Sequence, residues 1–209
     1  MQDKNLLLVE GNDDLHVVLA IQGQRSIRIL DKQDIVSKGG IDELIESFPV
    51  YLKSSGIRVL GAIVDADTDL NNRWLSLRNH LIEAGYKNVP ETPNTGGTVI
   101  ESPAMSILPR VGIWLMPDNS TTGILEDFLR YLIPQNDALF SHVEASVNSI
   151  PETEKRFSTL AKPKALIHTW LAWQMEPGRP LGLSITAQFL NQDVPQVDLF
   201  VAWLQKLYT

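Results

Sequence analysis

Residues 6–14 read LLLVEGNDD, and residues 58–69 read RVLGAIVDADTD. Each stretch is a short apolar run that ends in acidic residues. Continuous apolar runs of this length are typical of parallel strands that are buried on both faces. We therefore predict two buried parallel strands, at Asn5–Val9 and Arg58–Val64, and expect carboxylates at the end of each.

The rest of the first half alternates between strand and helix patterns, and from residue 124 onward the apolar spacing is helical. Such alternation predicts an α/β fold, with a mostly parallel central sheet flanked by helices. We expect further strands at residues 27–30, 98–100 and 111–116, the last two as an antiparallel pair, and helices at residues 15–21 (capped by Asn12 or Asp13), 41–48, 74–84, 124–133, 138–148, 164–175 and 197–207. The division expected is an α/β domain at 1–122 and a helical extension at 123–209 packed on it.

The composition excludes several classes of protein. The 209 residues include no cysteine, so any metal must be held by oxygen or imidazole, which favours hard ions such as Mg²⁺. The net charge of −7 argues against a protein that coats nucleic acid by bulk electrostatics, although a metal centre brings its own positive charge. No apolar run approaches the roughly 20 residues of a membrane span, and residues 1–4 are polar. We expect a cytoplasmic location and no membrane partner.

Three carboxylates follow the two apolar runs. Glu10 ends the first run, and Asp65 and Asp67 end the second. Ligands of open α/β sheets gather at the carboxyl ends of strands, and we predict that the strand at Asn5–Val9 lies beside the strand at Arg58–Val64, which brings these acids to one rim. Packed carboxylates repel one another, and a divalent cation removes the repulsion. The residues thus predict a Mg²⁺ or Mn²⁺ site. Asp69 reaches the same site if the chain stays extended; the alternative is that it begins a loop or caps a helix.

The order and spacing of these motifs resemble the Toprim signature. That family pairs a strand-terminal Glu-Gly, here at Glu10-Gly11, with a strand-terminal Asp-x-Asp, here at Asp65-Ala66-Asp67. Gly39-Gly40, before a predicted helix, resembles the family's central segment. The resemblance covers about the first 120 residues. Because the chain has no ATPase P-loop, it resembles small stand-alone relatives of the Toprim half of OLD-type nucleases. The implied activity is Mg²⁺-dependent phosphoryl transfer on nucleic acid, most simply by a nuclease.

The resemblance also implies roles for residues. Glu10 would ligate a metal or act as a general acid/base, and Asp65 and Asp67 would ligate metal. In OLD-like relatives a later acid joins the site and a lysine lies near it. The additional residues implied are Asp14 and Glu126 as metal ligands, and Lys162 or Lys164 as catalytic lysines. The alternative for Glu126 is an acid at a helix start, where the dipole favours it, and for the lysines an exposed position in solvent.

Other functions stay open. A non-cleaving metal- or nucleotide-binding regulatory module of a defence or repair system, acting with a partner protein, would suit the acidic pI of about 5.1. A primase- or topoisomerase-like activity ranks last, because the chain has neither zinc-binding cysteines nor a visible tyrosine-nucleophile domain. The expected partners are nucleic acid, DNA or RNA, and a second copy or partner protein. The apolar side of residues 197–207 predicts a core-packing helix, with self-association as the alternative.

Overall fold

A five-stranded sheet organises the chain, and the computed structural model describes it over residues 4–209. The strand order is β2-β1-β3-β5-β4. The strands are β1 (Lys4–Val9), β2 (Ile35–Ser37), β3 (Ile57–Asp65), β4 (Thr98–Ile100) and β5 (Arg110–Met116). All neighbours are parallel except β4 and β5. The α/β fold with a mostly parallel sheet is confirmed, as are the pairing of the two apolar runs and the antiparallel pair at 98–100 and 111–116.

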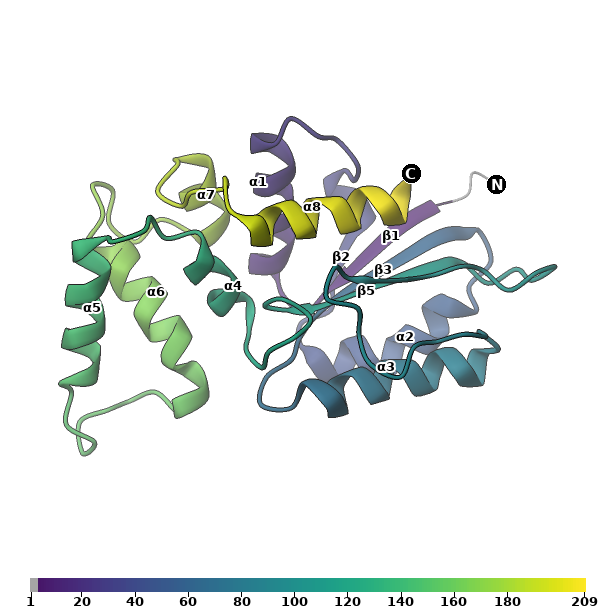
Figure 1. Cartoon of the computed structure of the whole chain (residues 1–209), viewed down its shortest axis with the longest axis horizontal. Helices are drawn as coiled ribbons and strands as arrows, with labels where there is room; N and C mark the ends of the chain where they lie inside the picture. The colour runs from purple at the N-terminus through teal and green to yellow at the C-terminus, as the bar shows by residue number, and fades with distance from the viewer. Residues whose placement is uncertain (1–3) are drawn as a thin grey trace.

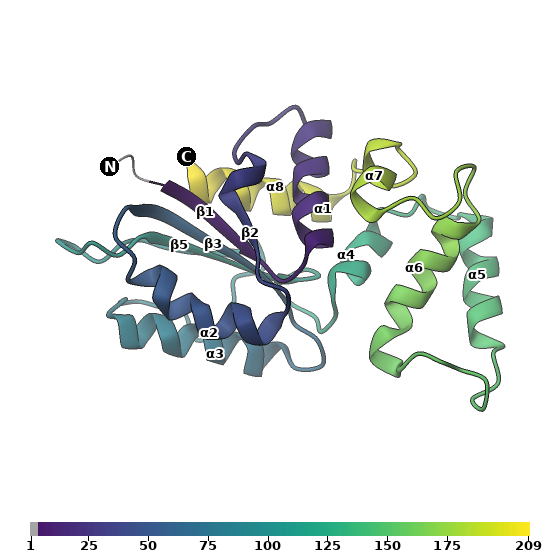
Figure 2. The ribbon, with the colours of Figure 1, turned by 180° about the vertical axis from the view of Figure 1, so that it is seen from behind.

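Helices cover both faces of the sheet. Helices α1 (Asn12–Gln24) and α8 (Pro195–Tyr208) lie on one face, and α2 (Ile41–Leu52) and α3 (Leu70–Ala84) lie on the other (Figures 1 and 2). Beyond the carboxyl ends of the parallel strands lie α4 (Leu125–Tyr131), α5 (Ala138–Asn148), α6 (Lys162–Ala172) and α7 (Leu181–Thr186). The carboxyl edge of the sheet therefore faces the helical part of the chain. No helix within residues 4–209 has the length and apolar character needed to cross a membrane.

The last helix of the chain closes one face of the sheet. Leu207 of α8 is fully buried, and a Cβ atom added to Gly112 would lie 2.3 Å from Leu207 Cδ2. Glycine at this position thus allows α8 to approach β5 closely. Tyr208 Oη donates to the carbonyl of Leu6 in β1 (2.7 Å). The core on this face therefore combines residues from both ends of the chain, while the division at residue 122 stays a prediction.

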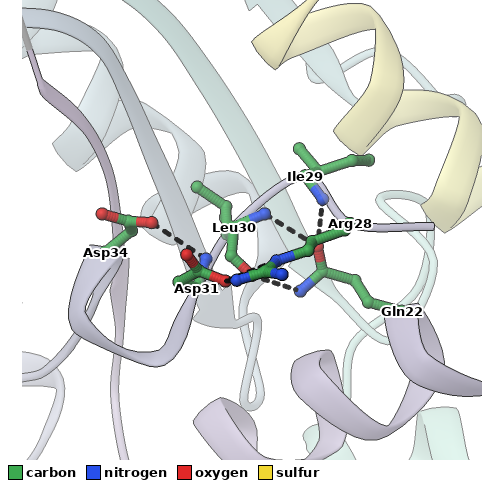
Figure 3. Close-up of polar contacts among 6 residues, drawn as sticks. All are labelled: Gln22, Arg28, Ile29, Leu30, Asp31 and Asp34. Carbon is green, nitrogen blue, oxygen red and sulfur yellow. Dashed lines mark hydrogen bonds and ion pairs between the residues drawn. The ribbon is translucent and has the colours of Figure 1, made fainter.

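The strand expected at residues 27–30 is wrong, because a buried glutamine occupies its backbone groups. Gln22 is 3% exposed; its Oε1 accepts from the amides of Ile29 (3.0 Å) and Leu30 (2.9 Å), and its Nε2 donates to the Leu30 carbonyl (3.3 Å). Figure 3 shows this side chain facing the irregular segment. The second parallel strand comes later, at Ile35–Ser37, and pairs with β1.

Two further differences concern helix ends and short helices. The N-cap of α1 is Gly11, and not Asn12 or Asp13, because the Asp14 carboxylate reaches back to accept from the Gly11 amide (2.9 Å). The six-residue helix α7 was not predicted, since Leu181–Thr186 is too short to show an apolar period. It packs on α1, where Gly182 lies directly against the backbone of the first helix.

Candidate functional site

The candidate site lies where the strand order changes direction. From β1 the chain passes through α1 to β2 on one side, and α2 then returns it to β3 on the other side. The carboxyl ends of β1 and β3 flank this switch point, which is where open α/β sheets bind ligands. Glu10 directly follows β1, and Asp65 is the last residue of β3. The sheet therefore brings the two predicted acids to one rim.

Glu10 and Asp65 are joined by hydrogen bonds to neighbouring backbone. Glu10 Oε1 accepts from the Asp65 amide (2.7 Å), and Asp65 Oδ1 accepts from the Leu125 amide at the start of α4 (3.0 Å). The Gly39 amide donates to the Glu10 carbonyl (2.9 Å), so the predicted glycine turn also contacts this edge. These bonds connect β1, β3 and α4 around the acids, and they hold one oxygen of each carboxylate in place.

An arginine that the sequence analysis missed holds Asp67. Arg73 Nη2 lies 2.6 Å from Asp67 Oδ2, and Arg73 Nε donates to the carbonyl of Asp65 (3.0 Å). Asp67 itself has a positive φ of 50°, and its amide donates to the carbonyl of Gly123 (2.9 Å). The sequence offered no spacing signal for this pair, because Arg73 is six positions after Asp67 and the i,i+3 and i,i+4 pairs of a helix do not include it.

Two buried acids complete the cluster. Asp14 in α1 is 7% exposed, and Glu126 in α4 is 3% exposed. Lys164 Nζ lies 3.6 Å from Glu126 Oε1, although the lysine side chain is 57% exposed. The structure thus brings together the later acid and one of the two candidate lysines. Lys162, at the start of α6, is exposed. We call Glu10, Asp14, Asp65, Asp67 and Glu126 the acid cluster.

Asp69 lies outside the acid cluster. Its Oδ1 accepts from the Asn72 amide (2.9 Å), and its Oδ2 accepts from the Asn72 side chain (2.8 Å). It is the N-cap of α3 and is exposed. Of the two alternatives that the sequence left for this residue, the structure contains the helix cap, because the chain turns sharply at Asp67 instead of staying extended.

Burial raises the pKa values of three members of the acid cluster, Glu10, Asp14 and Asp65. Burial raises the pKa of Asp65 to about 9, and the charges of Glu10 and Asp14 add to this effect. Burial also raises the pKa of Glu10 to about 7, although the hydrogen bond from the Asp65 amide opposes it. For Asp14 burial raises the pKa to about 6. Without a cation these carboxyl groups cannot all be charged at pH 7, since their charges are close together and poorly hydrated.

A family model described as a protein of unknown function, DUF3226, matches residues 4–209. The chain belongs to the DUF3226 family. The match runs from β1 to the end of α8, so it includes every member of the acid cluster. Comparisons with curated proteins and with solved structures each found no match.

The carboxylate donors of the acid cluster in this DUF3226 chain suit a hard divalent cation, but their side chains are not placed around a common point. Its donors are carboxylate oxygens, the pKa values of Glu10 and Asp65 are raised, and a bound cation would relieve the repulsion among the carboxylates. Within residues 4–209, however, no group of three or more histidine, aspartate or glutamate side chains is arranged to hold a metal ion. One oxygen each of Glu10, Asp65 and Asp67 is already engaged, by the Asp65 amide, the Leu125 amide and Arg73. Binding a cation would therefore require the carboxylates to turn their other oxygens toward one point or to exchange these partners.

Proposed function

We propose that this DUF3226 chain is a Mg²⁺-dependent phosphoryl-transfer enzyme that acts on nucleic acid, most specifically a nuclease of the OLD/Toprim type. The observation that carries the proposal is the hydrogen bond from the Asp65 amide to Glu10, because it joins the two sequence motifs at the switch point of the sheet. The raised pKa values of both residues add support, since perturbed carboxyl groups cluster at functional sites. The Toprim resemblance supplies the reaction class.

Each residue has a proposed role. Glu10, Asp65 and Asp67 would hold Mg²⁺ or Mn²⁺, with Asp14 and Glu126 as additional acids behind them. When bound, the cation would neutralise the carboxylates and the negative charge that develops on a phosphodiester. Glu10 Oε1 is bonded to the Asp65 amide, so Glu10 Oε2 is the atom available to take up or release a proton.

Basic residues near the acid cluster would bind the phosphate of the nucleic acid. Lys164 lies at the edge of the acid cluster with an exposed side chain, so it can leave Glu126 and bind a phosphate oxygen. Lys162 lies at the start of the same helix, two positions before it. Arg73 would keep the loop that carries Asp67 in place and would contribute a fixed positive charge.

The decisive experiment compares the unmodified chain with Asp67→Asn on single-stranded, duplex and structured DNA and RNA. We expect cleavage with Mg²⁺ or Mn²⁺, its loss with chelator, and a decrease of at least about 100-fold in Asp67→Asn. Asp69→Asn is the matched control, because it changes the same residue type two positions away, where asparagine caps a helix equally well. Activity that survives unchanged in Asp67→Asn would contradict the proposal.

A second candidate is the non-cleaving regulatory module. It is favoured by the charge around the acid cluster: of the basic side chains in residues 4–209, Arg73 and Lys164 are the two that form ion pairs with it. A net charge of −7 adds to this shortage of positive charge. Measurable Mn²⁺ binding that Asp67→Asn weakens, without cleavage of any substrate by the unmodified chain, would support this module over the nuclease.

A further inference from the structure

Two neighbouring cavities lie beside the acid cluster. The first has a volume of about 280 Å³ and is lined by Asp67 and Thr68 from the loop after β3 and by Thr122 and Asp127. The second has a volume of about 420 Å³, shares Thr122 and Asp127 with the first, and reaches α5. The two cavities therefore adjoin at Thr122 and Asp127, so one lies at the proposed metal ligand Asp67 and the other at the helical part of the chain. We call the second cavity the aromatic pocket.

The aromatic pocket has flat walls on two different helices. Phe140 of α5 lies under the guanidinium group of Arg130, whose carbon is 5.6 Å from the ring centre, and Glu144 pairs with the same arginine (3.1 Å). Tyr131 of α4 donates its hydroxyl hydrogen to Asp118 Oδ2 (3.0 Å). Asp118 is held in turn by the backbone of the loop after β5. The rings and the guanidinium plane are thus positioned before any ligand arrives.

The polar groups of the aromatic pocket suit a flat heterocycle. Asp127 Oδ2 accepts from the Ile124 amide (3.1 Å), which leaves Oδ1 as an acceptor at the junction of the two cavities. Aromatic rings and arginine planes are the surfaces on which unpaired bases stack, and carboxylates accept from base amino groups. Pockets of this size class take small ligands. Thr122, at the same junction, is exposed and adds a hydroxyl group.

We infer that the aromatic pocket receives one nucleobase of a single-stranded nucleic acid whose neighbouring phosphate lies at Asp67. This inference rests on the proposed function, and it specifies the substrate as an unpaired strand. A paired base would first have to leave its stack, so duplex enters less readily. The choice of nucleic acid follows from the position of the pocket next to the cavity that Asp67 lines and from the stacked Arg130–Phe140 pair.

The test measures binding rather than cleavage. Single-stranded DNA and RNA oligonucleotides of about 12 nucleotides, each with a 2-aminopurine, and the matching duplexes are titrated with the full chain in Ca²⁺. We expect the chain to prefer one or both single strands, and Phe140→Leu to weaken their binding at least about fivefold. Tyr51→Leu is the matched control, because Tyr51 also lies under a cation, Lys38 (5.0 Å), but on α2. Arg130→Gln changes an exposed side chain and gives the answer if Phe140→Leu fails to fold.

The outcomes separate this inference from the proposed function. The inference would be overturned if the unmodified chain, Phe140→Leu and Arg130→Gln bound the single strands equally well. Equal binding of duplex and single strand, or no binding of either, would also overturn it. Unchanged Mn²⁺ affinity in the pocket variants is expected, because neither residue contacts the acid cluster in the described structure. Failure of Asp67→Asn to affect cleavage would instead contradict the nuclease and leave the binding result standing.

Discussion

Two regions of the same sheet bury different kinds of side chain: the face under α8 buries apolar groups, and the carboxyl edge buries ionisable ones. Under α8 the contacts are apolar and close, with Leu207 fully buried against Gly112. At the edge, Asp14 and Glu126 are almost as deeply buried, yet they carry ionisable groups. Burying apolar surface stabilises the fold, whereas burying crowded carboxylates destabilises it. Departures of this kind from the rules of stable packing are expected at functional sites.

Removing an apolar contact under α8 should have the largest effect on stability. We expect Leu207→Ala to lower the free energy of unfolding by about 2–5 kcal/mol, because it leaves a cavity between α8 and the sheet. Urea denaturation measures this change. The Mn²⁺ affinity of the folded variant should stay the same, since α8 lies on the face and not at the edge (Figure 1). A stability loss below about 1 kcal/mol would show that the packing relaxes around the smaller side chain.

The buried acids at the carboxyl edge should make the stability of the chain depend on pH. The folded-state pKa values of Glu10, Asp14 and Asp65 are raised to about 7, 6 and 9. The folded chain therefore binds more protons than the unfolded chain once the pH exceeds about 4. The contribution of these three groups to stability is therefore highest below that pH. It falls as the pH rises through 6, 7 and 9.

Thermal unfolding at several pH values tests this behaviour. We expect a loss of several kcal/mol between about pH 5 and about pH 8 without metal, because each unit of raised pKa corresponds to about 1.4 kcal/mol. Saturating Mg²⁺ should remove most of the loss, because a cation favours the charged carboxylates. A stability that rises with pH in the metal-free chain would mean that the hydrogen bonds from the Asp65 and Leu125 amides outweigh the effect of burial.

The same contrast explains which features the sequence could predict. The two apolar runs and the acids after them are local patterns. They predicted neighbouring strands at Asn5–Val9 and Arg58–Val64 with Glu10 and Asp65 at their ends, and the structure pairs these strands. The antiparallel partner strands were also visible as apolar runs. A side chain that hydrogen-bonds to a distant segment leaves no such pattern in the sequence. Strand β2 is only three residues long, and the choice between it and residues 27–30 depends on the side chain of Gln22.

Within the site, the missing information was geometric. Arg73 joins Asp65 and Asp67 only because the loop turns at the positive φ of Asp67, which brings the start of α3 back onto the strand end. Glu126 and Lys164 could be proposed only through the family resemblance, and their proximity depends on how α4 packs against α6. Tertiary packing of this kind cannot be read from residue spacing.

A single carboxylate at the edge can be neutralised without changing its shape. Glu10→Gln keeps an acceptor for the Asp65 amide and removes one charge from the acid cluster. We expect the metal-free variant at about pH 8 to be more stable by on the order of 1 kcal/mol, and to bind Mn²⁺ about tenfold more weakly. Glu46→Gln, on the exposed side of α2, is the control and should change neither quantity. A marked loss of stability in Glu10→Gln would identify Glu10 as a structural residue.

The smallest expected effect concerns competition for Asp67. In the described structure Arg73 pairs with Asp67 Oδ2, so the guanidinium group and a cation would compete for the negative charge of this carboxylate. Arg73→Gln should therefore strengthen Mn²⁺ binding about threefold, a modest gain because the Asp67 side chain is 39% exposed and solvent screens the pair. Arg73→Lys keeps the charge but loses the double contact to Asp65 and Asp67, so its affinity should fall between the two. Isothermal titration gives these affinities. If Arg73→Gln binds Mn²⁺ more weakly than the unmodified chain, then Arg73 positions the loop for the metal, and its hydrogen bond to the Asp65 carbonyl matters more than its charge.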